Sequence, residues 1–298
     1  MHTRFINNIT LFLLLLLPAQ GWAQSVVELT VDGGYATTMY NVPDGKRIGG
    51  IGYGVDIGYA YFFHPNVGLG VGAGFRHYAG GAQISGLLTY PKVVDTDNEP
   101  YDHFTIYDKW KEQQSLYYLE FPISFQFRVP LNKVDLWMAA GVNYSLALKG
   151  TTSAQGNLTH RGYYKKWDLT MDIPEHGFYT TSDFRPSSSI KVHDVVALFA
   201  RVDVGIPLAK RWQFLVGVNI HYALMPAFST EGEAPLGYRN DCQEWSRAHY
   251  FMSDYVPLLN TSQLSGKACP LSLDLELGIR YIFHTHKRRA YPCRCLAD

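Results

Sequence analysis

Apolar and polar residues alternate with a period of two over eight segments of the chain. In the last segment every odd position is apolar or aromatic, and the even positions include Asp274, Glu276 and Arg280. Such alternation is typical of β-strands, because successive side chains point to opposite faces. The segments are Val26–Thr37, Gly50–Phe63, Asn66–Tyr78, Ser115–Val129, Val134–Leu148, Val195–Pro207, Trp212–Met225 and Leu271–Phe283. The chain is therefore expected to be all-β.

The connections between these segments alternate strictly in length. The short ones are residues 64–65, 130–133 and 208–211, and the long ones are residues 38–49, 79–114, 149–194 and 226–270. An even number of strands with short turns on one side and long loops on the other is the plan of bacterial outer-membrane barrels. The pattern predicts an eight-stranded antiparallel up-and-down transmembrane β-barrel with short periplasmic turns and long extracellular loops.

The aromatic positions indicate which face meets lipid. A soluble lipocalin-type barrel has an apolar interior, whereas a membrane barrel turns its apolar face outward. Threading the strands up and down places two rings of aromatic residues on the apolar face, with aliphatic residues between them. The loop-side ring is Tyr35, Tyr53, Phe75, Tyr117, Tyr144 and Tyr222, and the turn-side ring is Tyr61, Phe63, Phe125, Phe127, Trp212, Tyr281 and Phe283. Two such rings are the aromatic girdles of a barrel in the cell outer membrane.

The polar face then becomes the interior, which in an eight-stranded barrel is just wide enough for its side chains to fill. Buried charges require partners, so we expect a paired network that plugs the barrel. A proton or ion path is the alternative. The predicted network is Glu28, Asp32, Asp56, Arg76, Glu120, Arg128, Arg201, Asp203, Asp274, Glu276 and Arg280.

The two ends of the chain differ from the strands between them. Residues 1–23 have the features of a signal peptide: Arg4, an apolar run over 11–17, and the small-residue cleavage site Gly21-Trp22-Ala23. The expected organisation is a signal peptide over 1–23, an outer-membrane barrel over 24–284 and a periplasmic tail over 285–298.

The four cysteines of an exported chain favour disulfides. Cys242 and Cys269 fall in the same long connection, so we expect them to pair. Cys293 and Cys295 lie in the tail, where no standard zinc spacing is found, and no metal site is predicted. The formal net charge of zero gives no reason to expect nucleic acid as a partner.

Two further sequence features resemble a cofactor-binding motif and a catalytic histidine, but the residues around them do not favour either role. The glycines of residues 68–73 match a dinucleotide-binding fingerprint, but they continue at period two within one strand, so no cofactor is expected. His77 sits near the outer rim, where lipid A-modifying barrel enzymes use a histidine with a serine and an acid. No serine adjoins it, and we interpret His77 as an interfacial anchor.

The run Tyr118-Leu119-Glu120-Phe121-Pro122-Ile123 resembles the Tyr-Leu-Glu-Ile-Pro-Leu signature of the PorT-like outer-membrane β-barrel family of Bacteroidota, which has an OmpA-like eight-stranded barrel. The resemblance covers about residues 24–284 and implies fold and location, with an accessory role in type IX protein secretion as one function. Glu276, Gly278, Tyr281 and Phe283 are similar to the C-terminal signal that the barrel assembly machinery reads.

The long connections are rich in aromatic residues, which either bind a ligand or pack the loops into a cap. These residues are Tyr90, Tyr101, His103, Tyr107, Trp110, Tyr163, Tyr164, Trp167, Tyr238, Trp245, Tyr250 and Tyr255. The sequence favours a non-enzymatic barrel for surface binding, adhesion or membrane support. Its expected partners are outer-membrane lipid and lipopolysaccharide, the assembly machinery and an extracellular ligand. An accessory role in secretion and a lipid A-modifying enzyme are the alternatives.

Overall fold

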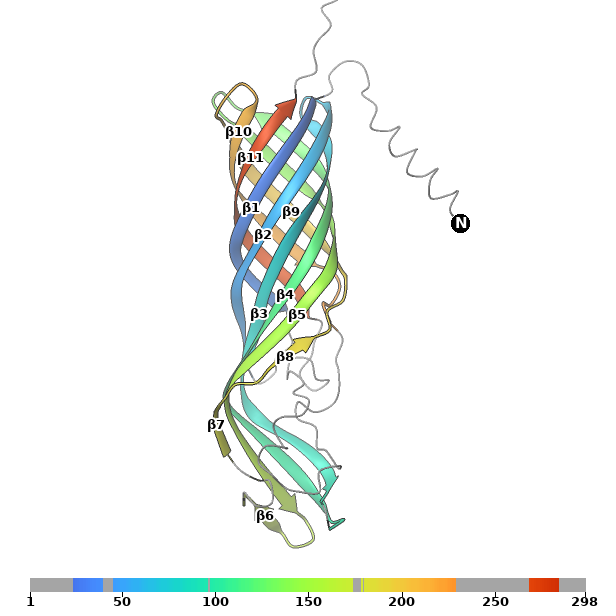
Figure 1. Ribbon diagram of the computed structural model, residues 1–298, viewed down its shortest axis with the longest axis vertical. Coiled ribbons are helices and arrows are strands. Elements are labelled where there is room, and N and C mark those ends of the chain that lie inside the picture. Colours follow the sequence, from blue (N-terminus) through green and yellow to red (C-terminus); the bar gives the residue numbers. More distant parts are fainter. Residues whose placement is uncertain are drawn as a thin grey trace, which may run out of the picture.

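The computed structural model describes residues 24–39, 45–95, 97–173, 178, 180–228 and 268–283 (Figure 1). These residues form strands and connections, and no helix among them is long and apolar enough to cross a membrane. The strands are β1 (Gln24–Met39), β2 (Gly45–His64), β3 (Val67–Val94), β4 (Pro100–Pro130), β5 (Asp135–Tyr164), β6 (Leu169–Met171), β7 (Thr180–Phe184), β8 (Ser187–Ile190), β9 (Val195–Pro207), β10 (Trp212–Ala223) and β11 (Cys269–Phe283).

Eight of these strands close into a ring. Their order is β4-β3-β2-β1-β11-β10-β9-β5, and β4 pairs with β5 to complete the circle. The two ends of the barrel sequence meet where β1 runs antiparallel to β11, from Ser25 opposite Phe283 to Met39 opposite Cys269. The predicted eight-stranded antiparallel barrel is confirmed.

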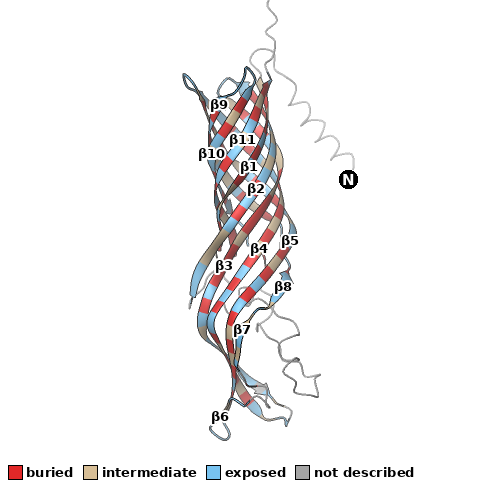
Figure 2. Ribbon diagram, turned by 60° about the vertical axis from the view of Figure 1, so that its left-hand side comes forward, coloured by how far each residue is buried: buried red, intermediate tan, exposed pale blue. Residues whose placement is uncertain are grey.

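Buried and exposed residues alternate along the barrel strands (Figure 2), and the exposed ones are largely apolar, the reverse of a soluble barrel. Ile51 and Leu275 point outward and are 75% and 71% exposed, whereas the charged Arg76, Glu120 and Arg280 are buried inside. A closed ladder leaves no unpaired backbone edge, so such a surface can face hydrocarbon directly. The barrel therefore spans the outer membrane, with its apolar side chains toward lipid.

Pro122 occupies an interior position of β4 that tolerates a residue without an N–H group. Strand β3 pairs with β4 at Val71 opposite Ile123 and again at Gly74 opposite Glu120, with no paired residues between these two positions. Because the ladder is interrupted there, proline removes no donor from that side of the sheet.

Two of the predicted long loops are in large part strand. Residues 79–114 and 149–194 contain the outer halves of β3, β4 and β5, which leave the barrel as a three-stranded sheet (Figure 1). We call Gly81–Val94, Pro100–Gln114 and Gly150–Tyr164 the arm; β6, β7 and β8 pair along its β5 edge. A strand of this length projects roughly 45 Å at about 3.3 Å per residue. The prediction of loops over 79–114 and 149–194 is wrong in large part. The alternating positions of the arm are occupied by Gln, Ser, Thr and Tyr rather than by aliphatic residues, so they do not resemble the membrane-spanning strands.

A β-bulge within the arm bends its outer part relative to the barrel. The pairing of β4 with β5 shifts between Asp108 and Lys111, and Lys109 has a φ of 51°. An extra residue in one strand bends it and increases the local twist, and Figure 1 shows the sheet rotating below the barrel mouth. The bulge thus sets the direction in which the arm projects.

Two apolar clusters lie at the two ends of the charged interior, one inside the barrel at the turn side and one that extends from the barrel mouth into the arm. The turn-side cluster is Val26, Ala60, Phe62, Trp137, Leu215 and Ile282. The mouth cluster joins Tyr78, Trp110, Leu116, Tyr118 and Ile190 to residues of β9, β10 and the segments around 227 and 268. The charged side chains therefore lie between the turn-side cluster and the mouth cluster.

The outward face of β11 offers a test of the membrane-spanning arrangement. We expect Leu275→Arg to lower the free energy of unfolding in phosphatidylcholine vesicles by about 2–4 kcal/mol, because it places a cation near the middle of the bilayer. Leu87→Arg is the matched control, since Leu87 is 55% exposed on the arm. It should change the unfolding free energy by no more than about 0.5 kcal/mol. Equal costs at the two positions, measured by reversible urea unfolding, would contradict the arrangement.

Candidate functional site

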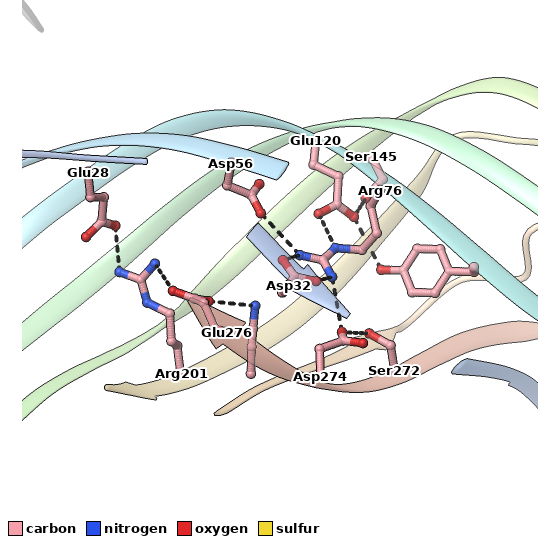
Figure 3. Close-up of polar contacts among 12 residues, drawn as sticks. Glu28, Asp32, Asp56, Arg76, Glu120, Ser145, Arg201, Ser272, Asp274 and Glu276 are labelled. Atoms are coloured by element: carbon pink, nitrogen blue, oxygen red, sulfur yellow. Dashed lines mark hydrogen bonds and ion pairs between the residues drawn. The ribbon is translucent and has the colours of Figure 1, made fainter. Parts of the chain in front are cut away.

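Arg76 on β3 is the centre of the first of two charged clusters inside the barrel (Figure 3). It is almost completely buried, and all five guanidinium donors are used. The bonds run from Nε to Glu120 (2.9 Å), from Nη1 to Asp32 (2.7 Å) and Asp274 (3.2 Å), and from Nη2 to Asp32 (3.1 Å) and Asp56 (3.3 Å). Five strands supply these residues, so one side chain joins much of the ring. We call this group the Arg76 cluster.

Hydroxyl groups complete the coordination of the Arg76 cluster. Tyr78 Oη and Ser145 Oγ both donate to Glu120 Oε1, at 3.3 and 3.1 Å, and Ser272 Oγ donates to Asp274 Oδ2 at 2.7 Å. These residues were missed by sequence reasoning that sought charges alone. The period-two pattern could have found them, because Tyr78, Ser145 and Ser272 share the inward face.

The second cluster, which we call the Arg201 cluster, lies toward the turn side. Arg201 donates from Nη2 to Glu28 Oε1 (2.6 Å) and from Nη1 to Glu276 Oε1 (3.2 Å), and its Nε is 3.1 Å from Asp203 Oδ2. Arg280 donates to the other oxygen of Glu28, with Nε at 3.0 Å. Glu28 therefore bridges two arginines from different strands.

Arg128 is the one predicted network residue that the structure places outside both clusters. Its Nη2 donates to Asp135 at 2.9 Å near the periplasmic turns. Its guanidinium carbon lies 5.1 Å from the centre of the Trp137 ring, and that of Arg280 lies 3.9 Å away from the same ring. Trp137 thus separates the charged interior from the turn-side end through two cation–π contacts.

The two clusters contain more negative than positive side chains. Seven carboxylates (Glu28, Asp32, Asp56, Glu120, Asp203, Asp274 and Glu276) face three guanidinium groups (Arg76, Arg201 and Arg280). Removing one partner of a buried pair leaves an uncompensated charge in low dielectric, which costs far more than losing a surface pair.

The inner face of the arm is packed with aromatic and histidine side chains. Tyr101 stacks on Tyr164 with ring centres 5.2 Å apart and meets Phe178 edge-on at 5.6 Å. His103 Nε2 and His160 Nδ1 lie 3.0 Å apart and are both buried. Burial lowers the pKa of His103 to about 4 and of His160 to about 3, the latter also through the neighbouring His103. Both imidazoles are therefore neutral at pH 7.

The aromatic residues predicted for the long loops divide into three groups. Tyr101, His103, Tyr107, Trp110 and Tyr164 are buried in the arm, which agrees with the interpretation as a packed cap. Trp167 is exposed and Tyr163 is half-buried. Tyr238, Trp245, Tyr250, Tyr255 and the side chain of Tyr90 lie outside the described residues.

The outer face of the arm is polar and carries a surface groove of about 250 Å³. It is lined by Lys111 and Gln113 of β4, Ser153 and Gln155 of β5, Arg185, and Ser187 of β8. Asp183, at a φ of 51°, accepts from Gln155 Nε2 (2.7 Å) and from Arg185 Nε and Nη2 (3.1 and 2.8 Å). The groove is thus pre-ordered, and in the described part of the chain Lys111 has no carboxylate partner.

His77 lies between the rings of Tyr53 and Tyr117, each with its centre 4.7 Å away. It belongs to the outward face near the barrel mouth. Within the described residues neither a serine nor a carboxylate hydrogen-bonds to it. The contacts with two tyrosine rings agree with the interpretation of His77 as an anchor at the membrane interface.

The last strand places the predicted assembly residues on both of its faces. Glu276 points inward to Arg201, whereas Phe283 is exposed at the turn-side end of β11 together with the half-buried Tyr281. A Cβ on Gly278 would lie 2.6 Å from Thr30 Cγ2 and 2.8 Å from the Leu29 carbonyl, so the backbones approach closely there. Recognition by the assembly machinery stays a prediction.

The predicted disulfide falls only partly on described residues. Cys269 is buried in the mouth cluster, while Cys242, Cys293 and Cys295 lie outside the described ranges. The pairing of Cys242 with Cys269 stays a prediction, as do the signal peptide over 1–23 and the periplasmic tail over 285–298.

Substitution of Arg76 tests how far the barrel depends on its first cluster. We expect Arg76→Met to lower the unfolding free energy by about 3–5 kcal/mol, because four carboxylates lose their shared cation. Arg185→Met in the exposed arm removes a bidentate pair as well, but should cost less than about 1 kcal/mol. Urea unfolding in vesicles measures both. A loss at Arg76 no larger than at Arg185 would show that the cluster is not required.

The buried histidine pair predicts acid sensitivity of the arm. Because the folded pKa values lie below the ordinary 6.5, stability from the neutral pair is complete above about pH 6.5 and is lost as pH falls toward 4. Hydrogen exchange of backbone amides in 103–107 and 158–162, corrected for intrinsic rates, should therefore accelerate between pH 7 and 5. In His103→Phe/His160→Phe the acceleration should shrink. The same pH dependence in wild type and variant would rule out the pair as its source.

Comparisons with known proteins add little beyond architecture. No family model matches the chain, and no curated protein matches it. Among solved structures, Neisserial surface protein A is 9% identical with a TM-score of 0.37, covering 88% of this chain and 100% of its own. The outer membrane protein OprG from Pseudomonas aeruginosa is 10% identical with a TM-score of 0.37, covering 89% and 97%. Ail of Yersinia pestis, solved with the heparin analogue sucrose octasulfate, is 10% identical with a TM-score of 0.33, covering 88% and 100%. Values this low carry no argument about what the chain binds or does.

Proposed function

We propose that this protein is a non-enzymatic outer-membrane barrel that binds a ligand at the cell surface through its arm. The observation that carries the proposal is the arm itself, which continues three barrel strands as one hydrogen-bonded sheet. A barrel that served only as a membrane plug would need no sheet of this length. The arm holds its outer face at a fixed distance from the membrane.

The interior favours a surface role over passage of solutes. Side chains of the two charged clusters and the two apolar clusters fill the barrel, and the cavity left between the charged clusters measures about 50 Å³. This volume is well below that of ordinary ligand pockets, which measure about 300–1,000 Å³. Binding is therefore assigned to the extracellular side.

The outer face of the arm supports a hydrogen-bonding ligand. The groove presents two amide side chains, two serine hydroxyls and the ammonium group of Lys111, while Asp183 holds Arg185 in place. Amides and hydroxyls bind polyhydroxylated molecules, and an unpaired ammonium group favours a negative charge among them. We infer that the ligand is an acidic saccharide chain.

The register of the arm allows a clean deletion. Gly81 lies opposite Gln113, and Gly150 lies opposite Ile190. Replacing residues 82–112 and 151–189 each by an Asn-Gly turn removes the partners of residues 45–47 at the outer end of β2 but keeps the β2–β3 pairs from Ile48 opposite Gly81 inward. The barrel should therefore still close, which heat-modifiable gel mobility verifies. We expect cells displaying this variant to lose binding to beads carrying an immobilised acidic polysaccharide, with neutral dextran beads as the background.

A point variant tests the groove without altering the fold. Lys111→Gln should weaken binding to the acidic beads by about tenfold, the equivalent of 1.4 kcal/mol. Lys149→Gln is the matched control. Lys149 lies on β5 and is exposed like Lys111, but it does not line the groove. If the deletion variant binds like wild type, or wild type binds acidic beads no better than dextran, the proposed function is wrong. Equal loss in both lysine variants would contradict the groove.

A further inference from the structure

A small cavity lies between the Arg76 and Arg201 clusters, in the middle of the barrel. It has a volume of about 50 Å³, room for roughly three water-sized groups. Four carboxylates line it: Asp56 and Glu120 from the Arg76 cluster, and Glu28 and Glu276 from the Arg201 cluster. The one guanidinium group in its wall is that of Arg201. The cavity therefore lies where two acidic clusters face each other.

The side chains around this cavity include more carboxyl groups than guanidinium groups. In the Arg76 cluster four carboxylates share one cation whose five donors are all engaged. In the Arg201 cluster three carboxylates share two cations. Like charges in a medium of low dielectric repel strongly, and they are tolerated only when a counter-charge lies nearby. The excess carboxyl groups are therefore neutralised either by protons or by a bound cation.

Three further polar side chains in the cavity wall have atoms without a hydrogen-bond partner. Asn143 is 0% exposed, and both its Nδ2 and its Oδ1 have no hydrogen bond within the described part of the chain. His221 is 4% exposed with both ring nitrogens unpaired, and Asn219 is 5% exposed with Oδ1 unpaired. All three line the cavity. Buried polar atoms are almost always hydrogen-bonded, so these atoms indicate a bound polar species.

The chemistry of the wall identifies that species. Carboxylate and amide oxygens are the ligands of hard cations, and waters retained by such a cation can bond to Asn143 and His221. Among the described residues, no three His, Cys, Asp or Glu side chains converge closely enough to hold a metal ion directly. We propose that the cavity binds a hydrated alkali or alkaline-earth cation, which links the two clusters electrostatically.

Ion content gives the direct test. Full-length protein in detergent is dialysed into N-methylglucamine buffer at pH 7.5, re-equilibrated with sodium, potassium, magnesium or calcium chloride at constant ionic strength, and gel-filtered for elemental analysis. We expect one of these ions to be retained at about one per chain and to raise the Tm by several degrees relative to N-methylglucamine. No retained ion and the same Tm in all five buffers would overturn the proposal.

Variants locate the ion. Glu276→Gln keeps an acceptor for Arg201 but removes one charge from the wall, so the retained ion and its Tm increment should both fall severalfold. Asn143→Leu fills part of the cavity with an apolar side chain and should abolish both effects, which serves if Glu276→Gln does not fold. Asp97→Asn, in the exposed turn between β3 and β4, is the control and should retain both. Retention that is unchanged in Glu276→Gln and Asn143→Leu would place the ion elsewhere and overturn the assignment.

Discussion

The constraint on which this structure depends is that no backbone amide in the lipid region can be left without a hydrogen-bond partner. A sheet in hydrocarbon satisfies this only when its first and last strands pair, and here β1 and β11 do so over 15 residues each, from Ser25 to Met39. Closure fixes which side of every strand faces lipid. It also makes the inside of the barrel a closed space, in which every polar side chain must find its partners among the others.

The small radius of the ring controls how charge is accommodated in that space. Glycine recurs on the inward face where a neighbouring strand carries a carboxylate: a Cβ on Gly58 would meet Glu28, and one on Gly74 would meet Asp56. In the glycine-rich run of 68–73, a Cβ on Gly70 would lie 2.5 Å from Gln126 Nε2, so this run has a steric role on β3 as well. Removing these side chains makes room for the acids, and the acids require the arginines. One geometric limit thus links the glycines of β2 and β3 to Arg76.

Much of the barrel can be predicted from the sequence. Each strand within the membrane has one face toward lipid and one toward the interior, so the period-two alternation of apolar and polar residues identifies both faces. Ten of the predicted interior charges, all but Arg128, fall in the Arg76 and Arg201 clusters. Which carboxylate pairs with which arginine depends on strand tilt and register, which alternation does not encode. Arg128 has the same parity as Glu120 on β4 but lies next to the turn, where it pairs with Asp135.

The arm shows where that method of prediction fails. Outside the bilayer a strand need not carry aliphatic residues, so the alternation of Gln83, Lys111 and Gln155 against buried Ala82, Trp110 and Ala154 resembles a polar loop. What distinguishes it is the aromatic content of the inner face, which sequence reasoning attributed to loops. Because β3, β4 and β5 run without a break from barrel to arm, and their mouth cluster includes Trp110, Leu116 and Tyr118, the arm and barrel share one ladder and one core. The strands that form the arm are therefore the same strands that carry Arg76, Glu120 and Ser145 in the barrel. The charged interior of the barrel and the outer face of the arm thus both depend on the pairing of β3, β4 and β5.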